Sequence, residues 1–340
     1  NNIEVLEEDA KDVITYSSFL PIVLSNMNSK SLQLYNLNRQ ESLTVPYSTI
    51  KFSKKARLDG IREVNYFMGY ESPDTSPMIR SILDLWGFNS YIEYLYTVCE
   101  LGFLEGLIPV LELGFLKPDD LKLISEVCAS IRVMYNFAPQ TSKVAMSPSQ
   151  KLINDKLMLW SSKLGIPINL GVFIGLGETK TQVKKLLNSI AKIHEEYGYV
   201  HEFTIQNYVP SGNKPFNLNE TKEKDMLMFT EMALNILPDD ISVIVPIESN
   251  PKIKPFIKLG VRDIGKLTYG KRGLFSADTG NLETINETIE NSGFRLQKRF
   301  PLKKSFIQSG KYSKKLGQVF DSYKYKIKKE EQEKLKELKA

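Results

Sequence analysis

The sequence predicts an α/β fold, a parallel (β/α) barrel, complete or partial and of the TIM type, with a basic helical tail at its C-terminus. Apolar runs typical of strands alternate with amphipathic helical patterns along most of the chain. From about residue 130 the expected strands recur every 35 to 40 residues, the usual period of βα units in a parallel sheet. At 340 residues the chain is long enough for one such barrel with appendages.

The best-defined unit lies in the middle of the chain. Ser147 and Pro148 are the residue types preferred at a helix N-cap and at the first helical position. Residues 166–174 are almost continuously apolar, which is typical of a strand covered on both faces. Thr179 and Gln182 fit a capping box, so a helix is expected from there, followed by a strand over residues 201–208.

Similar units are expected on both sides of this one. Residues 28–60 are polar and irregular, which predicts a long loop after the first strand, where long loops are often functional. An open doubly wound sheet is the alternative, but no GxGxxG sequence follows a first strand. The remaining strands are expected at 17–24, 61–68, 105–111, 130–136 and 241–246, and the remaining helices at 77–101, 117–128, 220–236 and 281–292.

Composition indicates a protein outside the membrane. The chain is 42% hydrophobic and 25% charged, and no stretch approaches the roughly 18 apolar residues of a membrane span. Residues 16–24 are apolar, but they are too few, contain Pro21 and follow an acidic stretch, so they do not fit a signal peptide. A cytoplasmic location is expected. The chain begins with Asn1 and not with Met, which is consistent with a start further upstream.

Basic residues are concentrated at the C-terminus. The net charge is +5, but residues 298–340 hold 14 Lys/Arg against 5 Asp/Glu. We expect a barrel domain over 1–307 and a Lys-rich helical extension over 308–340. Apolar residues recur in the extension at helical spacing, which favours a solvated amphipathic helix over a nucleic-acid site. Nucleic acid is therefore not expected as a partner.

The two cysteines are expected to be structural. Cys99 and Cys128 each lie in a helical pattern, where a buried thiol behaves as a small apolar side chain. Neither has a histidine or a second cysteine at ligand spacing, so the sequence predicts no metal site.

Candidate ligand contacts follow the expected strands, because the carboxyl ends of barrel strands carry the sites of this fold. Gly175 and Gly177 would let a flat ring approach the backbone, or they form a tight turn. Glu178 would contact the ligand, or it complements the dipole of the next helix. Gln206 and Asn207 are adjacent carboxamides that point to opposite faces of a strand, so one must face the interior and needs a partner there.

Two segments of the chain resemble a known family. Residues 171–179 and 195–210, the latter reading EEYGYVHEFTIQNYVP, are similar to the matching regions of the CofG-type subunit of deazaflavin (FO) synthase, a radical-SAM enzyme. The resemblance extends more weakly from about Ser18 to Ile307. It implies a radical-SAM barrel with a nucleoside or S-adenosylmethionine pocket, and it brings three further positions into the expected site, namely Glu71, Asn136 and Gly171.

The resemblance also implies positions for an iron–sulfur cluster. The family holds a four-iron cluster on three thiolates, spaced CxxxCxxC in the loop after the first strand. The corresponding positions in this chain are Asn28, Leu32 and Tyr35, and no CxxxCxxC occurs elsewhere. From these residues we expect no iron–sulfur cluster and a degenerate member of the family.

Three functions remain open, and the sequence assigns no catalytic residue. The first is a pseudoenzyme that serves as a binding or partner subunit, paired with an active radical-SAM protein or holding a nucleoside or flavin-like ligand. The second is a working subunit of FO synthase whose cluster is completed by another chain. The third is cluster-free acid–base chemistry by Glu71 and Glu178, which would need their pKa values to be well separated.

Overall fold

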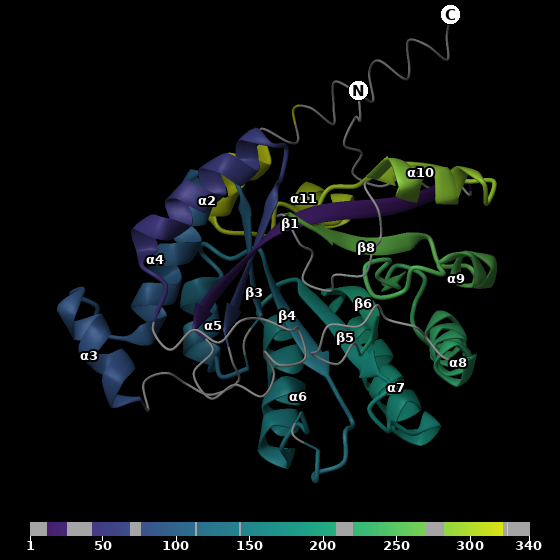
Figure 1. The fold of residues 1–340 in the computed structure, drawn as a ribbon. Helices are drawn as coiled ribbons and strands as arrows, with labels where there is room; N and C mark the ends of the chain where they lie inside the picture. Colours follow the sequence, from purple (N-terminus) through teal and green to yellow (C-terminus); the bar gives the residue numbers. More distant parts are fainter. Residues whose placement is uncertain are drawn as a thin grey trace, which may run out of the picture.

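The computed structural model describes residues 12–25, 43–68, 76–112, 114–142, 144–208, 220–269, 282–321 and 325. Within them, eight parallel strands close into a barrel, and the connecting helices lie on its outside (Figure 1). The predicted barrel is therefore confirmed, and it is complete. Its strands are β1 Val13–Ser25, β2 Glu63–Met68, β3 Ile108–Glu112, β4 Ser130–Tyr135, β5 Ile168–Ile174, β6 Val200–Asn207, β7 Ser242–Ile244 and β8 Asp263–Thr268, and β9 Arg295–Lys298 is added at the edge.

The helices pack around this barrel in chain order. None of the described helices is both long and apolar enough to cross a bilayer. They are α2 Pro46–Leu58, α3 Pro77–Leu85, α4 Tyr91–Leu104, α5 Pro118–Ile124, α6 Pro148–Lys163, α7 Lys180–Tyr197, α8 Glu220–Ile236, α9 Lys254–Leu259, α10 Leu282–Glu290 and α11 Lys304–Ser309.

Strand β1 closes the barrel. It is 13 residues long and crosses the view diagonally in Figure 1. Its first residues pair with β9, its middle pairs with β8, and Phe19 to Ser25 pair with β2. Because one strand contacts both β2 and β8, the sheet has no open edge between them.

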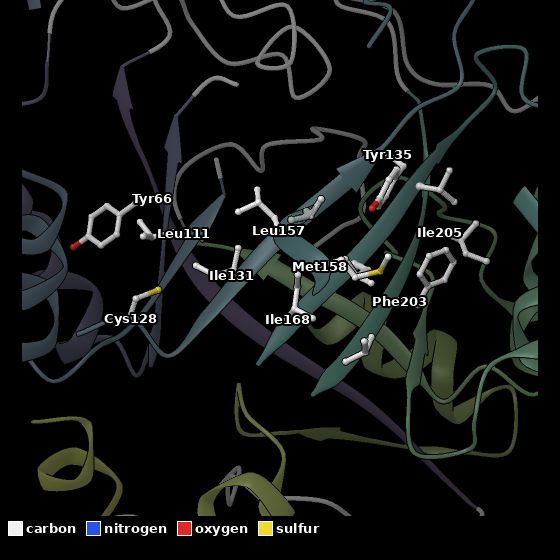
Figure 2. Close-up of a cluster of buried hydrophobic side chains, with 14 of the residues drawn as sticks. Tyr66, Leu111, Cys128, Ile131, Tyr135, Leu157, Met158, Ile168, Phe203 and Ile205 are labelled. Atoms are coloured by element: carbon white, nitrogen blue, oxygen red, sulfur yellow. The ribbon is translucent and has the colours of Figure 1, made fainter. Parts of the chain in front are cut away.

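The main core lies between the strands and the helices. Side chains at alternate strand positions point outward, as the period of two residues requires. The outward side chains of two strands pack against the helices (Figure 2). They are Ile131 and Tyr135 of β4 and Phe203 and Ile205 of β6, and Leu157 of α6 belongs to the same cluster. These outward positions explain why the strands read as apolar runs in the sequence.

The barrel interior is layered. At the amino ends of the strands an apolar cluster closes the barrel, and it includes Phe300, Phe306, Leu316 and Phe320 from the C-terminal segment. A layer of charged side chains follows, and beyond it Phe19, Phe67, Met134 and Phe173 pack together with other apolar side chains. Leu316 and Phe320 belong to the 308–340 extension, whose status as a separate unit stays a prediction.

Several segments differ from the sequence-based expectation, among them α9, β9 and α11, which were not expected. Residues 46–58 form α2 and not a loop, because small buried residues, Thr49, Ser53 and Ala56, pack the helix against α4 without an apolar stripe. The expected helix 77–101 is two helices, since Gly87 takes a positive φ and Ser90 caps α4. Strand β8 was not expected from the sequence, and it begins three residues after Gly260, the residue that ends α9.

Candidate functional site

The turn between β5 and α7 is built around Glu178. One oxygen of this carboxylate accepts a hydrogen bond from the backbone N–H of Gly175 at 2.8 Å, and the other accepts from Leu176 at 2.9 Å. Gly175 and Gly177 have φ values of 97° and 101°, which favour glycine strongly. The tight-turn interpretation therefore describes this segment, and any ligand contact by Glu178 would add to that role.

Gly171 faces the barrel interior from the middle of β5. A Cβ atom at this position would lie 2.5 Å from the sulfur of Met134 and 2.7 Å from the carbonyl oxygen of Thr204. These distances are far below van der Waals contact, so only glycine fits. The space above Gly171 is thus filled by the Met134 side chain of the neighbouring strand.

Asn136 follows β4, and protein groups satisfy its carboxamide. The side-chain nitrogen donates to the carbonyl oxygen of Val144 at 3.2 Å, and the oxygen accepts from the backbone N–H groups of Ala138 and Met146. Asn136 therefore organises the loop between β4 and α6. Its predicted role in ligand binding stays a prediction.

Gln206 and Asn207 lie at the carboxyl end of β6, and both are almost fully buried. Gln206 faces the barrel interior, and its nitrogen donates to the Asn207 carbonyl oxygen at 3.3 Å. The Asn207 side chain lies on the other face and donates to the Ser249 carbonyl oxygen at 3.2 Å. Among the described residues, neither carboxamide oxygen has a hydrogen-bond partner. Buried polar atoms normally have one, so each of these acceptors, on its own face of the strand end, is open to a hydrogen-bond donor.

The remaining predicted positions lie outside the described residues. These are Glu71 and the three family cluster positions, Asn28, Leu32 and Tyr35. The structure therefore brings together the turn at 175–178 and the pair at 206–207, which lie at the carboxyl ends of neighbouring strands, and it leaves Glu71 unplaced relative to them.

A small polar cavity lies inside the barrel, and the sequence-based reasoning missed it. Its volume of about 20 Å³ is enough for a water molecule. Arg132 of β4, Lys266 of β8 and three residues of β6, namely Glu202, Thr204 and Gln206, supply its polar lining. The alternating polar residues Glu202, Thr204 and Gln206 of β6 were the available signal, whereas Asp263 and Lys266 of β8 are three residues apart.

Ion pairs compensate the charges around this cavity. Lys266 contacts Glu63 at 2.8 Å and Glu202 at 3.6 Å, and Arg299 contacts Glu202 at 2.9 Å and also Asp263. Burial alone would raise the pKa of Glu202, but Lys266 and Arg299 lower that pKa to about 2. Burial raises the pKa values of Glu63 and Asp263 despite their cationic partners. Glu202 is thus held ionised as the centre of the network.

Both cysteines are buried and lie away from the carboxyl ends of the strands. Cys99 is in α4, and Cys128 precedes β4, where its thiol donates to the Ser130 carbonyl oxygen at 3.1 Å. Burial raises the pKa of the Cys99 thiol well above its usual value, so it is not a thiolate at neutral pH. The family that the sequence resembles holds its four-iron cluster on three thiolates. The cysteines of this chain do not fit that requirement.

No family model matches this chain, but curated proteins align with most of it. The 7,8-didemethyl-8-hydroxy-5-deazariboflavin synthase of Methanocaldococcus jannaschii is 29% identical over 318 residues, covering 90% of this chain and 88% of the relative. The synthase of the same name from Archaeoglobus fulgidus is 24% identical over 92% of this chain and 97% of its own length. That of Methanococcoides burtonii is 28% identical over 77% of this chain and 80% of the relative.

The fold has a similar solved structure. The FeFe-hydrogenase maturase HydG from Carboxydothermus hydrogenoformans superposes with a TM-score of 0.56 at 16% identity, covering 84% of this chain and 68% of the maturase. The chain is therefore similar in sequence to the deazariboflavin synthases, and its barrel is similar in fold to that of the maturase.

These relatives correct one expectation. We expected no iron–sulfur cluster, but the synthases to which the chain is similar are radical-SAM enzymes, which use S-adenosylmethionine and such a cluster. The expectation of no cluster is therefore contradicted by these relatives and is wrong. What holds for this chain is narrower: residues 1–340 contain two cysteines, so they do not supply three thiolates.

Proposed function

We propose that this relative of the deazariboflavin synthases binds a nucleoside-type ligand, S-adenosylmethionine or a close analogue, at the carboxyl ends of its strands. The observation that carries the proposal is the pair of unsatisfied carboxamide oxygens of Gln206 and Asn207 at the end of β6. They lie beside the glycine turn that follows β5. Amino groups of a nucleobase or of a methionyl group would donate hydrogen bonds to such acceptors.

The cysteine content supports a role beside an active subunit. Because the cysteines of residues 1–340 cannot hold a cluster on their own, the thiolates for radical chemistry would come from outside these residues. The chain would then contribute ligand binding to deazaflavin synthesis as a partner subunit. Cluster-free acid–base chemistry is less well supported, since both oxygens of Glu178 already accept backbone hydrogen bonds.

Thermal shift tests the binding role. A ligand that binds only the folded chain raises the midpoint of unfolding as its concentration exceeds the dissociation constant. We expect S-adenosylmethionine and its demethylated product to raise the midpoint, and guanosine triphosphate at the same ionic strength to leave it unchanged. No shift with either adenosyl compound would contradict the binding proposal.

Anaerobic reconstitution tests the partner role. The chain alone and the chain copurified with its cellular partner are each treated with iron and sulfide, and the visible absorption spectrum is recorded. We expect a stable cluster spectrum only with a partner that carries three further cysteines. A stable four-iron cluster on the chain alone would contradict the partner role and leave the ligand-binding proposal standing.

A further inference from the structure

Helix α2 presents a basic and apolar surface on the outside of the barrel. Its sequence, PYSTIKFSKKARL, contains four basic residues and no acidic one, and all four basic side chains are exposed. Large apolar side chains stand between them, with Tyr47 and Leu58 each 76% exposed and Phe52 52% exposed. Exposed apolar side chains framed by charges of one sign are typical of a surface that contacts another molecule.

The exposed side chains of α2 form a ridge. Residues three or four positions apart lie on the same face of a helix. On the outer face of α2 these residues are Tyr47, Lys51, Lys54 and Leu58. No carboxylate of the described residues is paired with Lys51, Lys54 or Lys55. The ridge therefore carries positive charge that its own chain does not compensate in the described structure.

Helix α10 carries the complementary surface. Its sequence, LETINETIE, contains three acidic residues and no basic one. Ile285 and Ile289 are buried, and the acidic side chains line the exposed face at Glu283, Glu287 and Glu290. This acidic ridge spans about 10 Å, at a rise of about 1.5 Å per residue, and the ridge of α2 spans about 16 Å. The acidic ridge therefore fits within the length of the basic one.

The other described helices match less well. Helix α4 also has acidic residues and no basic one, but Asn89 binds its Glu93 and Lys315 binds its Glu100 within the chain. Helices α9 and α11 have no acidic residues, but each is six residues long, with two lysines in α9 and one in α11. Charge and exposure therefore match α10 to α2.

The two helices lie on either side of β1. Helix α2 packs against β1, and α10 packs against β9, which pairs with the first residues of β1 (Figure 1). Both helices connect parallel strands and run opposite to them, so they are parallel to each other. A two-fold axis parallel to these helices, outside β1, places α2 of each copy against α10 of the other. The same contact then occurs twice and closes the assembly.

From these observations we infer that the chain forms a two-fold dimer in which α10 of each copy docks on α2 of the other. The lysines of α2 face the carboxylates of α10, and the contact covers Tyr47, Phe52 and Leu58. The dimer uses the outer wall of the barrel and none of the residues of the proposed ligand site. Dimer formation and ligand binding can therefore be tested separately.

Analytical ultracentrifugation of the full chain tests the dimer. We expect a dimer at low ionic strength, with a dissociation constant that rises about tenfold at high salt because salt screens exposed charge pairs. Lys51→Glu with Lys54→Glu, and separately Glu287→Lys with Glu290→Lys, should each weaken the dimer about a hundredfold, because like charges then face each other. Circular dichroism checks that both variants are folded. A native chain that stays monomeric would overturn the inference.

Mixing the two charge-reversed chains tests the pairing itself. In a mixed dimer the two reversed helices face each other, and the two native helices face each other, so every contact joins opposite charges. We expect the mixture to dimerise although neither chain does so alone. Lys180→Glu with Lys184→Glu, on exposed positions of α7, is the control and should leave the native dimer unchanged. A dimer that survives either reversal, or a mixture of folded chains that stays monomeric, would overturn the inference.

Discussion

Lys266 of β8 donates to both carboxylate oxygens of Glu63 of β2, at 2.8 and 2.9 Å, and this pair spans the inner face of β1. Both side chains are almost completely buried. The pair therefore joins the first and last repeats of the barrel beneath the strand that closes it. Its geometry makes barrel closure dependent on a charge contact as well as on backbone pairing.

Lys266→Met should destabilise the fold by about 3–5 kcal/mol, because it leaves the buried carboxylate of Glu63 without its main partner. Urea denaturation measures this loss. The double variant Lys266→Met with Glu63→Leu should recover much of it, since an apolar pair needs no charge compensation. Lys258→Met on exposed α9 is the control and should change stability little. Equal stability of Lys266→Met and the native chain would show that the pair does not hold the barrel closed.

His201 should make the fold sensitive to mild acid. Burial, reinforced by Lys303, lowers the pKa of His201 to about 3, so the folded chain keeps it neutral. The unfolded chain takes up that proton below about pH 6.5. Stability is therefore fully present above pH 6.5 and is lost as the pH falls. Between pH 7 and pH 5 the native chain should lose about 2 kcal/mol more than His201→Phe. Parallel stability curves for the two proteins would contradict this assignment.

Gly171→Ala should destabilise the barrel by about 1–3 kcal/mol, because the added methyl group would overlap the Met134 sulfur and the Thr204 carbonyl oxygen. Chemical denaturation tests the change. Gly317→Ala is a suitable control, since its methyl group would lie at 3.4 Å from the Tyr312 ring. If both variants lost the same stability, close packing over β5 would not be the reason for glycine at 171.

The fold could be predicted because its strands are covered on both sides. Residues 166–174 are apolar without interruption, and the helix after them has its capping box, Thr179 with Gln182, in place. β8 escaped prediction because Asp263 and Lys266 contact charged partners inside the barrel, so the strand does not read as apolar. α2 escaped because its buried face is made of Thr49, Ser53 and Ala56, which carry little hydrophobic signal.

The candidate site was predictable only in part. Strand-end position identified Gln206 and Asn207 as buried carboxamides, and both have an oxygen without a partner in the described structure. Sequence could not show that Asn136 would be committed to its own loop, or that Glu178 would bond two backbone N–H groups. Nor could it show the ion pairs of the interior, because these join residues far apart in the chain, such as Glu63 and Lys266.

Calorimetric titration with S-adenosylmethionine tests the central claim most directly. We expect saturable binding with one site per chain. Asn207→Leu and Gln206→Met, which remove the unsatisfied oxygens and keep the side-chain size, should each weaken it by about tenfold, a loss of about 1.4 kcal/mol. Lys163→Glu, at the other end of the barrel, should bind as the native chain does. Absence of binding by the folded native chain, or equal affinity in the Asn207→Leu and Gln206→Met variants, would contradict a nucleoside site at the carboxyl end of β6.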